Sequence, residues 1–349
     1  MPHSFLSKII LFICFIITML TISSYSPAGA HKCQVENVKR TFIQLWDKDS
    51  QRSVEEWEKQ FSELKDIGFS ELILQWSSYG WTDKPTANFV DDTYSEIYLS
   101  NIIQAAKIQG IKVWIGLHYD PSWWDRIEAN DNLTQEYLNF RLIKTSSKIQ
   151  QLSEIIKINN FDINVIAGWY ISDEIDDVNW NTKNRFNLLS NYFSSISHSL
   201  NQEDLNLPIM ISSFSNGNLS SVELSDFITK ITKQSNIDIL LFQDGIGVNK
   251  LSLQQLKKYL PPLSFNLKKA NKSLGLIVEL FQLQSNNNLV TSSYSQIAEQ
   301  ISIAEKWSNE YLTVFSAFDN LLAKNKPRTK ALLKRWQREY LKCISHDKT

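Results

Sequence analysis

The sequence predicts a single (β/α)₈ barrel that follows an amino-terminal signal peptide. Eight short, mostly apolar segments have the character of buried strands, and amphipathic segments alternate with them over about 310 residues. Strands that are apolar throughout belong to a sheet covered on both faces, and strict alternation with helices makes that sheet parallel. In addition, the fourth and seventh strands each lead into a glutamate, Glu174 and Glu279, as the strands of a barrel enzyme do.

The predicted strands are spaced so that each gap holds one helix. Each strand is short and rich in β-branched, leucine or aromatic residues, with polar residues gathered near its carboxyl end. In chain order they are Thr41–Trp46, Glu71–Trp76, Lys112–His118, Val165–Ile171, Pro208–Phe214, Ile237–Phe242, Leu274–Glu279 and Leu312–Phe318.

The intervening segments carry start and stop signals for helices. Ser53-Val54-Glu55-Glu56 is a capping box, and Gly68 ends the helix that it begins. A second helix is predicted from Ser95 to Gln109, before Gly110, and the last from Arg328 to Lys342, basic near its end. The Asn-rich stretch 285–288 is predicted to be a loop after strand seven.

The amino terminus has the organisation of a secretory signal peptide. Lys8 precedes an apolar run from Ile9 to Ile22, and the small residues 28–30, Ala-Gly-Ala, supply a cleavage site. We therefore predict that residues 1–30 are removed and that residues 31–349 form the barrel of an exported protein, periplasmic or released. The alternative is an uncleaved membrane anchor, but the run is shorter than the ~20 residues of a spanning helix.

The charge of the chain excludes one class of partner. Its formal net charge is −1, and the loss of a signal peptide that contains Lys8 and no acidic residue changes this to −2. A nearly neutral chain lacks the basic surface that binds the phosphates of nucleic acids. We expect a monomer that needs no cofactor and has no stable membrane insertion after cleavage.

The cysteines fit an exported protein. Cys14 leaves with the signal peptide, and Cys33 and Cys343 lie at opposite ends of the remaining chain. Because the two ends of a barrel chain meet at its bottom face, we predict a disulfide between them. Two free thiols are the alternative. No cysteine or histidine spacing in the sequence is typical of structural zinc.

Polar residues gather after the predicted strands, where barrel enzymes place their catalytic groups. Along strand four, the two-residue period of a strand turns Tyr170, Ser172 and Glu174 to the same side, and Glu279 likewise follows Ile277 inward. Glu174 could instead be a solvated loop acid and Glu279 part of a structural ion pair. The other polar candidates for the site are Gln44, Gln75, His118, Tyr119, Asp173, Gln243 and Asp244.

Several of the eleven tryptophans also follow strands. A flat ring with a polar edge suits the C–H face of a sugar, so we predict that Trp46, Trp76 and Trp123 or Trp124 form sugar subsites. Any one of them could instead close the top of the barrel by packing. The tryptophans expected around the mouth are Trp46, Trp76, Trp81, Trp123, Trp124 and Trp180.

The sequence resembles the large clan of retaining glycoside hydrolases on (β/α)₈ barrels, because one glutamate follows strand four and another stands at the end of strand seven. The segment Gly168-Trp169-Tyr170-Ile171-Ser172-Asp173-Glu174 is also similar to the bacterial domain of unknown function 4434, assigned to the same broad superfamily. The likeness covers most of the chain in its rhythm of strands and helices, and only the two strand ends are specific.

The resemblance implies a carbohydrate substrate, Glu174 as the acid/base and Glu279 as the nucleophile of a double displacement. His118 resembles a substrate-binding histidine of several clan members; a capped core histidine is the alternative.

The chain departs from the clan at two positions. The acid/base usually follows an Asn that holds the sugar 2-hydroxyl, and here that residue is Asp173. We expect Asp173 to accept the same hydrogen bond and its charge to raise the proton affinity of Glu174. A tyrosine that orients the nucleophile is also missing after strand six. Gln243 or Asp244 occupies that region, and Tyr170 or Tyr119 could take its place.

Two functions of other classes remain open. A metal-dependent barrel enzyme could draw ligands from the set Asp173, Glu174, Asp176, Asp244, Glu279 and His118. A non-catalytic barrel that binds glycans would keep the aromatic mouth and use its carboxylates only as hydrogen-bond acceptors. Sensitivity to chelators separates the first from a glycosidase, and unaltered oligosaccharide after long incubation separates the second.

Overall fold

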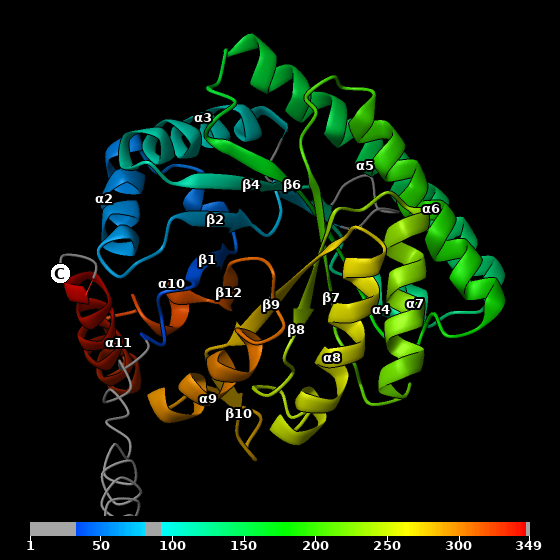
Figure 1. Ribbon diagram of the computed structural model, residues 1–349. Helices are drawn as coiled ribbons and strands as arrows, with labels where there is room; N and C mark the ends of the chain where they lie inside the picture. The colour runs from blue at the N-terminus through cyan, green and yellow to red at the C-terminus, as the bar shows by residue number, and fades with distance from the viewer. Residues whose placement is uncertain (1–32, 81–91, 347–349) are drawn as a thin grey trace, which may run out of the picture. The chain divides into compact units, whose positions relative to one another are not determined.

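The structure, a computed structural model, describes residues 33–80 and 92–346. The predicted signal peptide, residues 1–30, and Trp81 lie outside these residues. Eight parallel strands close into a barrel, in the order β1, β2, β4, β6, β7, β8, β9 and β12 around the ring (Figure 1). The predicted (β/α)₈ fold is confirmed.

All eight predicted strands are present, with shifted ends. The strand β1 begins three residues earlier than predicted, and β6 continues through Glu174 to Ile175. The strand β12 stops at Phe315, because Ser316 caps the short helix α10 (Ala317–Asn320). The barrel strands are β1 (Val38–Ile43), β2 (Glu71–Leu74), β4 (Lys112–Gly116), β6 (Ile166–Ile175), β7 (Ile209–Ser213), β8 (Ile239–Gln243), β9 (Ser273–Glu279) and β12 (Leu312–Phe315).

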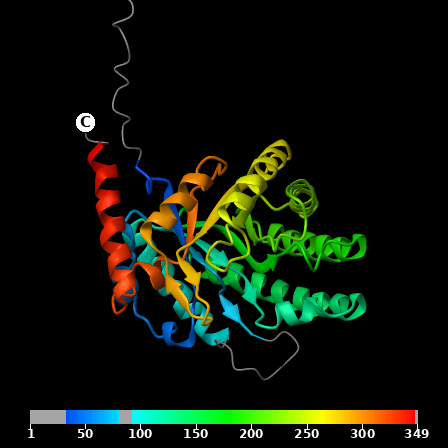
Figure 2. The same cartoon turned by 90° about the horizontal axis from the view of Figure 1, so that it is seen from below.

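A long helix follows each barrel strand and covers its outer face. Ser53 and Glu56 form the predicted capping box of the first one. Figures 1 and 2 show α11 and the pair α5 and α6 on opposite sides of the barrel. The helices are α2 (Val54–Lys65), α3 (Asp92–Gln109), α5 (Asp131–Ile158), α6 (Lys183–Asn201), α7 (Ser221–Gln234), α8 (Leu253–Lys269), α9 (Tyr294–Ala304) and α11 (Pro327–His346).

Short helices and strands follow the barrel strands at their carboxyl ends. The 3₁₀ turn η1 (Asp47–Asp49) and the helix α4 (Trp123–Ile127) follow β1 and β4. Two-residue strands β3 (Ser78–Tyr79) and β5 (His118–Tyr119) pair in parallel, and β10 (Phe281–Leu283) pairs with β11 (Leu289–Thr291) as a hairpin. The Asn-rich stretch 285–288 is the turn of this hairpin, a loop after the seventh barrel strand as predicted.

Alternate residues of the strands fill the barrel interior. Tyr170 of β6 and Ile277 of β9 belong to this buried cluster, so both point inward as predicted. A Cβ added to Gly275 would lie 2.5 Å from Leu241 Cδ2, so the Leu241 side chain would have to move to admit a larger residue. The cluster consists of Phe42, Ile73, Trp114, Tyr170, Met210, Ile239, Leu241 and Ile277. The same two-residue period carries Glu174 and Glu279 to the mouth of the barrel.

Cys33 and Cys343 are joined by a disulfide, as predicted from their places in the sequence. Among the residues that the structure describes, none of the helices combines the length and the hydropathy that a bilayer crossing requires.

We expect peptide mapping without reduction to recover Cys33 and Cys343 in one linked fragment. In the chain-entropy account, closing a loop of about 310 residues stabilises the fold by on the order of 4–5 kcal/mol. The Cys33→Ser/Cys343→Ser variant should therefore unfold at lower denaturant concentration. Recovery of both cysteines as alkylated thiols from the untreated protein would contradict the bond.

Candidate active site

A cavity of about 580 Å³ contains both predicted glutamates in its wall. Glu174 comes from β6 and Glu279 from the end of β9, and Gln243 ends β8 between them in the ring of strands. Phe42, Ile277 and Phe315 reach the cavity from the barrel interior and form its apolar floor. The fold thus brings two carboxyl groups, 105 residues apart in the sequence, to one space at the carboxyl ends of the strands.

Glu174 is held at its carboxylate and at its backbone. Its Oε1 accepts a hydrogen bond from Gln243 Nε2 at 2.6 Å and a longer one from Ser212 Oγ at 3.4 Å. Its carbonyl oxygen accepts a hydrogen bond from Trp123 Nε1 at 3.2 Å. Burial raises the pKa of Glu174, and the Gln243 amide and the charge of Lys250 oppose this rise. A carboxyl group with a raised pKa can hold a proton for donation.

Glu279 lies deeper, with 4% of its surface exposed. Its Oε2 accepts hydrogen bonds from the backbone N–H groups of Gly247 at 2.6 Å and Val248 at 3.2 Å. Burial raises the pKa of Glu279, whereas these two N–H groups and the Lys250 charge lower it. Two donors on one oxygen favour the ionised form over the protonated one.

Gly247 is required by the close approach of the loop after β8 to Glu279. A Cβ at this position would lie 2.8 Å from Glu279 Oε2 and 2.3 Å from the carbonyl oxygen of Phe281. Any other residue would push the loop away and remove the N–H donors from the carboxylate. The N–H groups of this loop hold the Glu279 carboxylate, whereas the Tyr170 hydroxyl lies beside Ser212 and Tyr119 stacks on Trp76.

Asp244 does not reach the cavity, contrary to expectation. It is buried, and its Oδ2 accepts a hydrogen bond from Gln300 Nε2 of α9 at 2.6 Å. Burial, reinforced by the charge of nearby Glu279, raises the pKa of Asp244 well above its ordinary value. The rise in pKa is larger at Asp244 than at Glu279, which favours Glu279 as the member of this buried pair that carries the negative charge.

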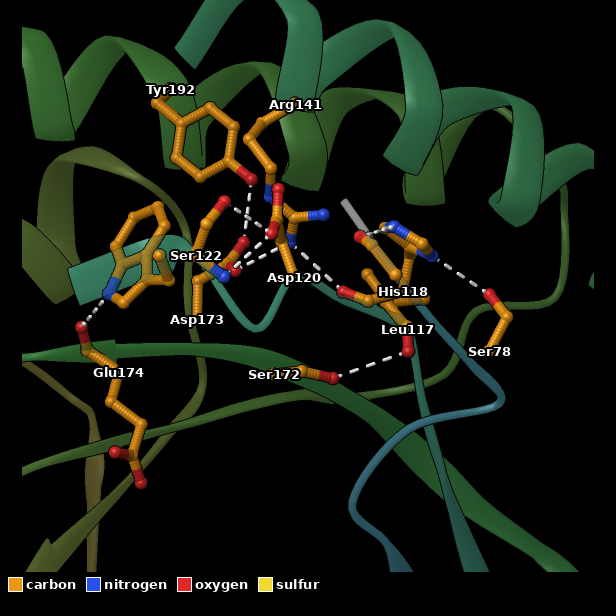
Figure 3. Close-up of polar contacts among 12 residues, drawn as sticks. Ser78, Leu117, His118, Asp120, Ser122, Arg141, Ser172, Asp173, Glu174 and Tyr192 are labelled. Atoms are coloured by element: carbon orange, nitrogen blue, oxygen red, sulfur yellow. Dashed lines mark hydrogen bonds and ion pairs between the residues drawn. The ribbon is translucent and has the colours of Figure 1, made fainter. Parts of the chain in front are cut away.

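Asp173 points away from the cavity, because it alternates with Glu174 along β6. Figure 3 shows its side chain turned toward α5 and α6, with the Glu174 carboxylate on the other side of the strand. Its Oδ1 accepts from Arg141 Nη2 at 2.5 Å and its Oδ2 from the Tyr192 hydroxyl at 2.6 Å. With 2% of its surface exposed, Asp173 has no oxygen available for a sugar. The expectation that it binds the 2-hydroxyl was wrong.

The Asp173 charge does raise the pKa of Glu174, although burial is the larger cause. Arg141, the ion-pair partner of Asp173, is fully buried on α5 and also donates a hydrogen bond to the carbonyl oxygen of His118 at 3.0 Å. One guanidinium group therefore ties α5 to β6 and to the segment after β4 (Figure 3). Trp123 also donates a hydrogen bond to the carbonyl oxygen of Glu174. Together, the Arg141 and Trp123 contacts fix the backbone on both sides of Glu174.

His118 is a capped core histidine rather than a cavity residue. Its Nδ1 lies 3.0 Å from Ser78 Oγ, and its Nε2 lies 3.1 Å from the carbonyl oxygen of Gly80. Burial and the charge of Arg141 lower the pKa of His118 to about 3, so the ring is neutral. A neutral ring can donate from Nε2 to the carbonyl and accept from Ser78 at Nδ1. The resemblance to a substrate-binding histidine does not hold in the structure.

The mouth tryptophans separate into buried and accessible ones. Trp76 and Trp123 are each 2% exposed, and Trp180 is fully buried, so none of the three presents a ring face to a sugar. Trp76 donates its Nε1 hydrogen to the carbonyl oxygen of Leu45 at 2.7 Å. Trp124 lines the cavity, 5.3 Å from the ring of Phe214. Trp46 is 41% exposed but lies outside the cavity wall.

Replacing Trp124 by alanine is expected to raise KM more than it lowers kcat, because a stacking platform contributes to ground-state binding. Trp76→Ala should leave KM unchanged and lower the free energy of unfolding by about 3–5 kcal/mol, as truncation of a buried aromatic ring does. Both variants are measured by steady-state kinetics and by denaturant unfolding, and each variant is the control for the other. A KM change in Trp76→Ala alone would contradict these placements.

The remaining predicted residues lie in or beside the cavity. Gln75 and Tyr170 line it, and the Tyr170 hydroxyl lies 2.8 Å from Ser212 Oγ. Gln44 donates to Gln75 Oε1 at 2.9 Å and so supports the wall from behind. Tyr119 stacks on Trp76, with ring centroids 4.8 Å apart, and does not line the cavity.

Several cavity residues were missed by the sequence analysis. Lys250 and Val248 come from the loop after β8, Phe214 and Asn216 follow β7, and Phe281 opens the β10–β11 hairpin. All of them lie within ten residues after the end of a barrel strand, and this position was the sequence signal that could have identified them.

The metal-enzyme alternative loses most of its ligands. Asp173, Asp244 and His118 are engaged outside the cavity, and both oxygens of Asp176 accept hydrogen bonds from Asn179. Within residues 33–80 and 92–346, no three His, Cys, Asp or Glu side chains are grouped as metal ligands.

The family profile of the Domain of unknown function (DUF4434) matches residues 38–331, from β1 into α11. The chain belongs to the DUF4434 family. This membership confirms the resemblance of the segment that ends in Glu174. A relative at the level of sequence is the uncharacterized protein YbcH of Escherichia coli (strain K12), 27% identical over 270 residues, which are 77% of this chain and 82% of that protein.

Solved structures share the barrel of this DUF4434 protein at low identity. A Bacteroides thetaiotaomicron VPI-5482 protein, described provisionally as an alpha-L-fucosidase, aligns with a TM-score of 0.66 and 16% identity over 87% of this chain and 93% of its own. A GH18 chitinase from Pseudoalteromonas aurantia gives 0.52 and 13% over 85% and 99%. An intracellular xylanase from Thermoanaerobacterium saccharolyticum gives 0.50 and 12% over 80% and 86%. At these identities the likeness shows the fold alone.

Proposed function

We propose that the protein is a glycoside hydrolase that cleaves a poly- or oligosaccharide by a retaining double displacement. The observation that carries this proposal is the meeting of Glu174 and Glu279 in one cavity lined by aromatic and amide side chains. Two carboxyl groups that flank a glycosidic bond are what its hydrolysis needs, and aromatic rings suit the apolar faces of sugars. The glycosidases among the proteins of the same fold support the proposal.

In the first displacement, the Glu279 carboxylate attacks the anomeric carbon while Glu174 gives its proton to the leaving glycosidic oxygen. The carbon–oxygen bond to the leaving group breaks, and an ester bond to Glu279 forms. The N–H groups of Gly247 and Val248 hold Glu279 Oε2, which favours attack by its other oxygen, Oε1. Glu174 keeps its proton before the step because burial raises its pKa.

In the second displacement, Glu174 has become a carboxylate and removes a proton from water. The water oxygen bonds to the anomeric carbon, the ester breaks, and Glu279 leaves as a carboxylate. Two inversions at one carbon give net retention.

The stereochemistry of the product tests this function. A screen of polysaccharides with detection of new reducing ends identifies a substrate, and NMR of the first product then gives its anomeric configuration. We expect the configuration of the starting glycoside. Inversion would overturn the double displacement, and measurable binding of a glycan with no product after long incubation would favour a non-catalytic glycan-binding barrel.

Glu174→Ala is expected to separate the two displacements. Substrates with a good leaving group need no proton from Glu174 and should still form the ester, whereas release of the intermediate needs a base and should become slow. Added azide, a nucleophile that needs no deprotonation, should restore part of the turnover and yield a glycosyl azide. Equal loss of activity with good and poor leaving groups, and no effect of azide, would remove Glu174 from this role.

We also propose that the enzyme is exported as a monomer after removal of residues 1–30. The disulfide between Cys33 and Cys343 supports an oxidising destination. Amino-terminal sequencing of the mature protein should begin at His31.

A further inference from the structure

The loop that connects β8 to α8, residues 244–252, delivers three groups to the site. Gly245 turns the chain in a left-handed conformation (φ +64°), and its carbonyl oxygen accepts from the backbone N–H of Lys250 at 2.9 Å. This closed turn aims the N–H groups of Gly247 and Val248 at Glu279 and places Lys250 in the cavity wall.

Lys250 is the one basic side chain in a described cavity wall that also contains Glu128, Glu174, Asp176 and Glu279. Its Nζ lies 3.2 Å from the centroid of the Phe214 ring, so the ammonium group is stacked on an aromatic face. Among the described residues, no carboxylate oxygen lies within 4.0 Å of Lys250 Nζ. The ammonium charge therefore acts on the surrounding carboxyl groups through space rather than in a direct ion pair.

The acidic groups around Lys250 differ in their solvent exposure and in the hydrogen bonds that already hold them. Asp176 and Asp177 are buried and already accept hydrogen bonds, Asp176 from Asn179 of its own loop and Asp177 from the Ser215 hydroxyl of the loop after β7. Glu128 is exposed to solvent, and Asp244 lies outside the cavity wall, where it accepts a hydrogen bond from Gln300. Glu174 and Glu279 are left as the cavity carboxyl groups that take part in the proposed reaction, Glu174 as the acid that must hold a proton and Glu279 as the nucleophile that must be ionised.

Burial favours the protonated form of both groups, and the first groups that oppose it are the N–H groups of Gly247 and Val248 at Glu279 and the Gln243 amide at Glu174. The ammonium group of Lys250 also opposes burial at both carboxyl groups, and the attraction operates in a half-buried site where water screens it weakly.

We propose that Lys250 is a positioning residue for charge: its ammonium group sets, and shifts to lower pH, the range in which the Glu174 and Glu279 pair is singly ionised, the state that double displacement requires. This inference deepens the proposed function and rests on it for its catalytic meaning. The charge state itself is a property of the protein that can be measured without a substrate.

Removing a positive charge raises the pKa of every nearby carboxyl group. In Lys250→Met we therefore expect the pKa values of Glu174 and Glu279 each to rise by about one unit. Methionine keeps an unbranched apolar chain against Phe214, so this variant removes the charge with little change in packing. Lys250→Arg keeps the charge and should keep both values close to those of the wild type.

The titration is followed by NMR of protein labelled with ¹³C at the glutamate carboxyl groups, with the two signals assigned through Glu174→Gln and Glu279→Gln. Lys257→Met is the matched control, because Lys257 lies on the exposed face of α8 in a long contact with Glu299 at 3.8 Å. It should change neither value. If Lys250→Met fails to fold, Lys250→Gln removes the same charge with a polar side chain.

Kinetics give the second measurement once a substrate is known. The pH profile of kcat/KM in Lys250→Met should keep its bell shape and move to higher pH by about one unit on both limbs. Unchanged carboxyl pKa values in Lys250→Met would overturn the inference, as would equal loss of activity in the Met and Arg variants at every pH, which would place Lys250 on the substrate. Shifted pKa values in a protein with no glycosidase activity would uphold the inference and refute the proposed function.

Discussion

Replacing Glu279 by glutamine is expected to lower kcat by a factor on the order of 10⁴ or more, as removal of a nucleophile does. A neutral amide cannot form the ester with the anomeric carbon. Its oxygen can still accept the hydrogen bonds from Gly247 and Val248, so the loop after β8 has no reason to move. The loss should therefore fall on the chemical step, with substrate binding retained.

Two measurements check that assignment. Calorimetry should show that Glu279→Gln binds the substrate found by the screen, while product formation stops. Mass spectrometry after treatment with a slow 2-fluoroglycoside should find the label on Glu279 in the wild type and none in the variant. Glu299→Gln, an exposed glutamate of α9, is the control and should keep full activity. Full activity in Glu279→Gln, or a label on another residue, would refute the mechanism.

Most of the fold could be predicted from the sequence because a parallel barrel leaves a strong pattern. Its strands are buried on both faces, so each appears as an apolar run, and each helix has a start or stop signal. The ends of strands were less predictable. The chain bends after Ile43 through the hydrogen bond of Trp46 to Asp49, and β6 runs on through polar residues that look like a loop. Contacts between distant segments decide such boundaries.

The two glutamates could be predicted for the same reason, since the two-residue period of a strand fixes which side chains face the mouth. That period also explains the error at Asp173. Once β6 is known to continue through Ile175, Asp173 must point opposite to Glu174, toward α5 and α6. The run of polar residues suggested a loop, and the partner that stabilises the charge, Arg141, is 32 residues away on a helix.

Lys250 and Gly247 were beyond prediction for a different reason. Their positions depend on the conformation of the loop after β8, and no periodicity specifies the direction of a loop side chain. The same holds for the tryptophans after strands, where Trp123 is buried and its neighbour Trp124 reaches the cavity.

The ion pair between Arg141 and Asp173 is expected to make a large contribution to stability. Their side chains are 0% and 1% exposed, so removal of either partner leaves a charge in a site that excludes water. Breaking such a pair typically costs about 3–5 kcal/mol. We expect Asp173→Asn and Arg141→Met each to lose about that much free energy of unfolding, with a fall in Tm on the order of 10 °C. Denaturant and thermal unfolding measure both quantities.

The double variant Asp173→Leu/Arg141→Met should recover part of the loss, because it removes both charges and leaves neither one unpaired. Lys257→Met breaks an exposed pair and should change stability by less than about 1 kcal/mol. Asp173→Asn is also the sharpest test of which way Asp173 points. If it instead unfolds like the wild type and has a raised KM, Asp173 binds the substrate and the orientation of the β6 side chains is wrong.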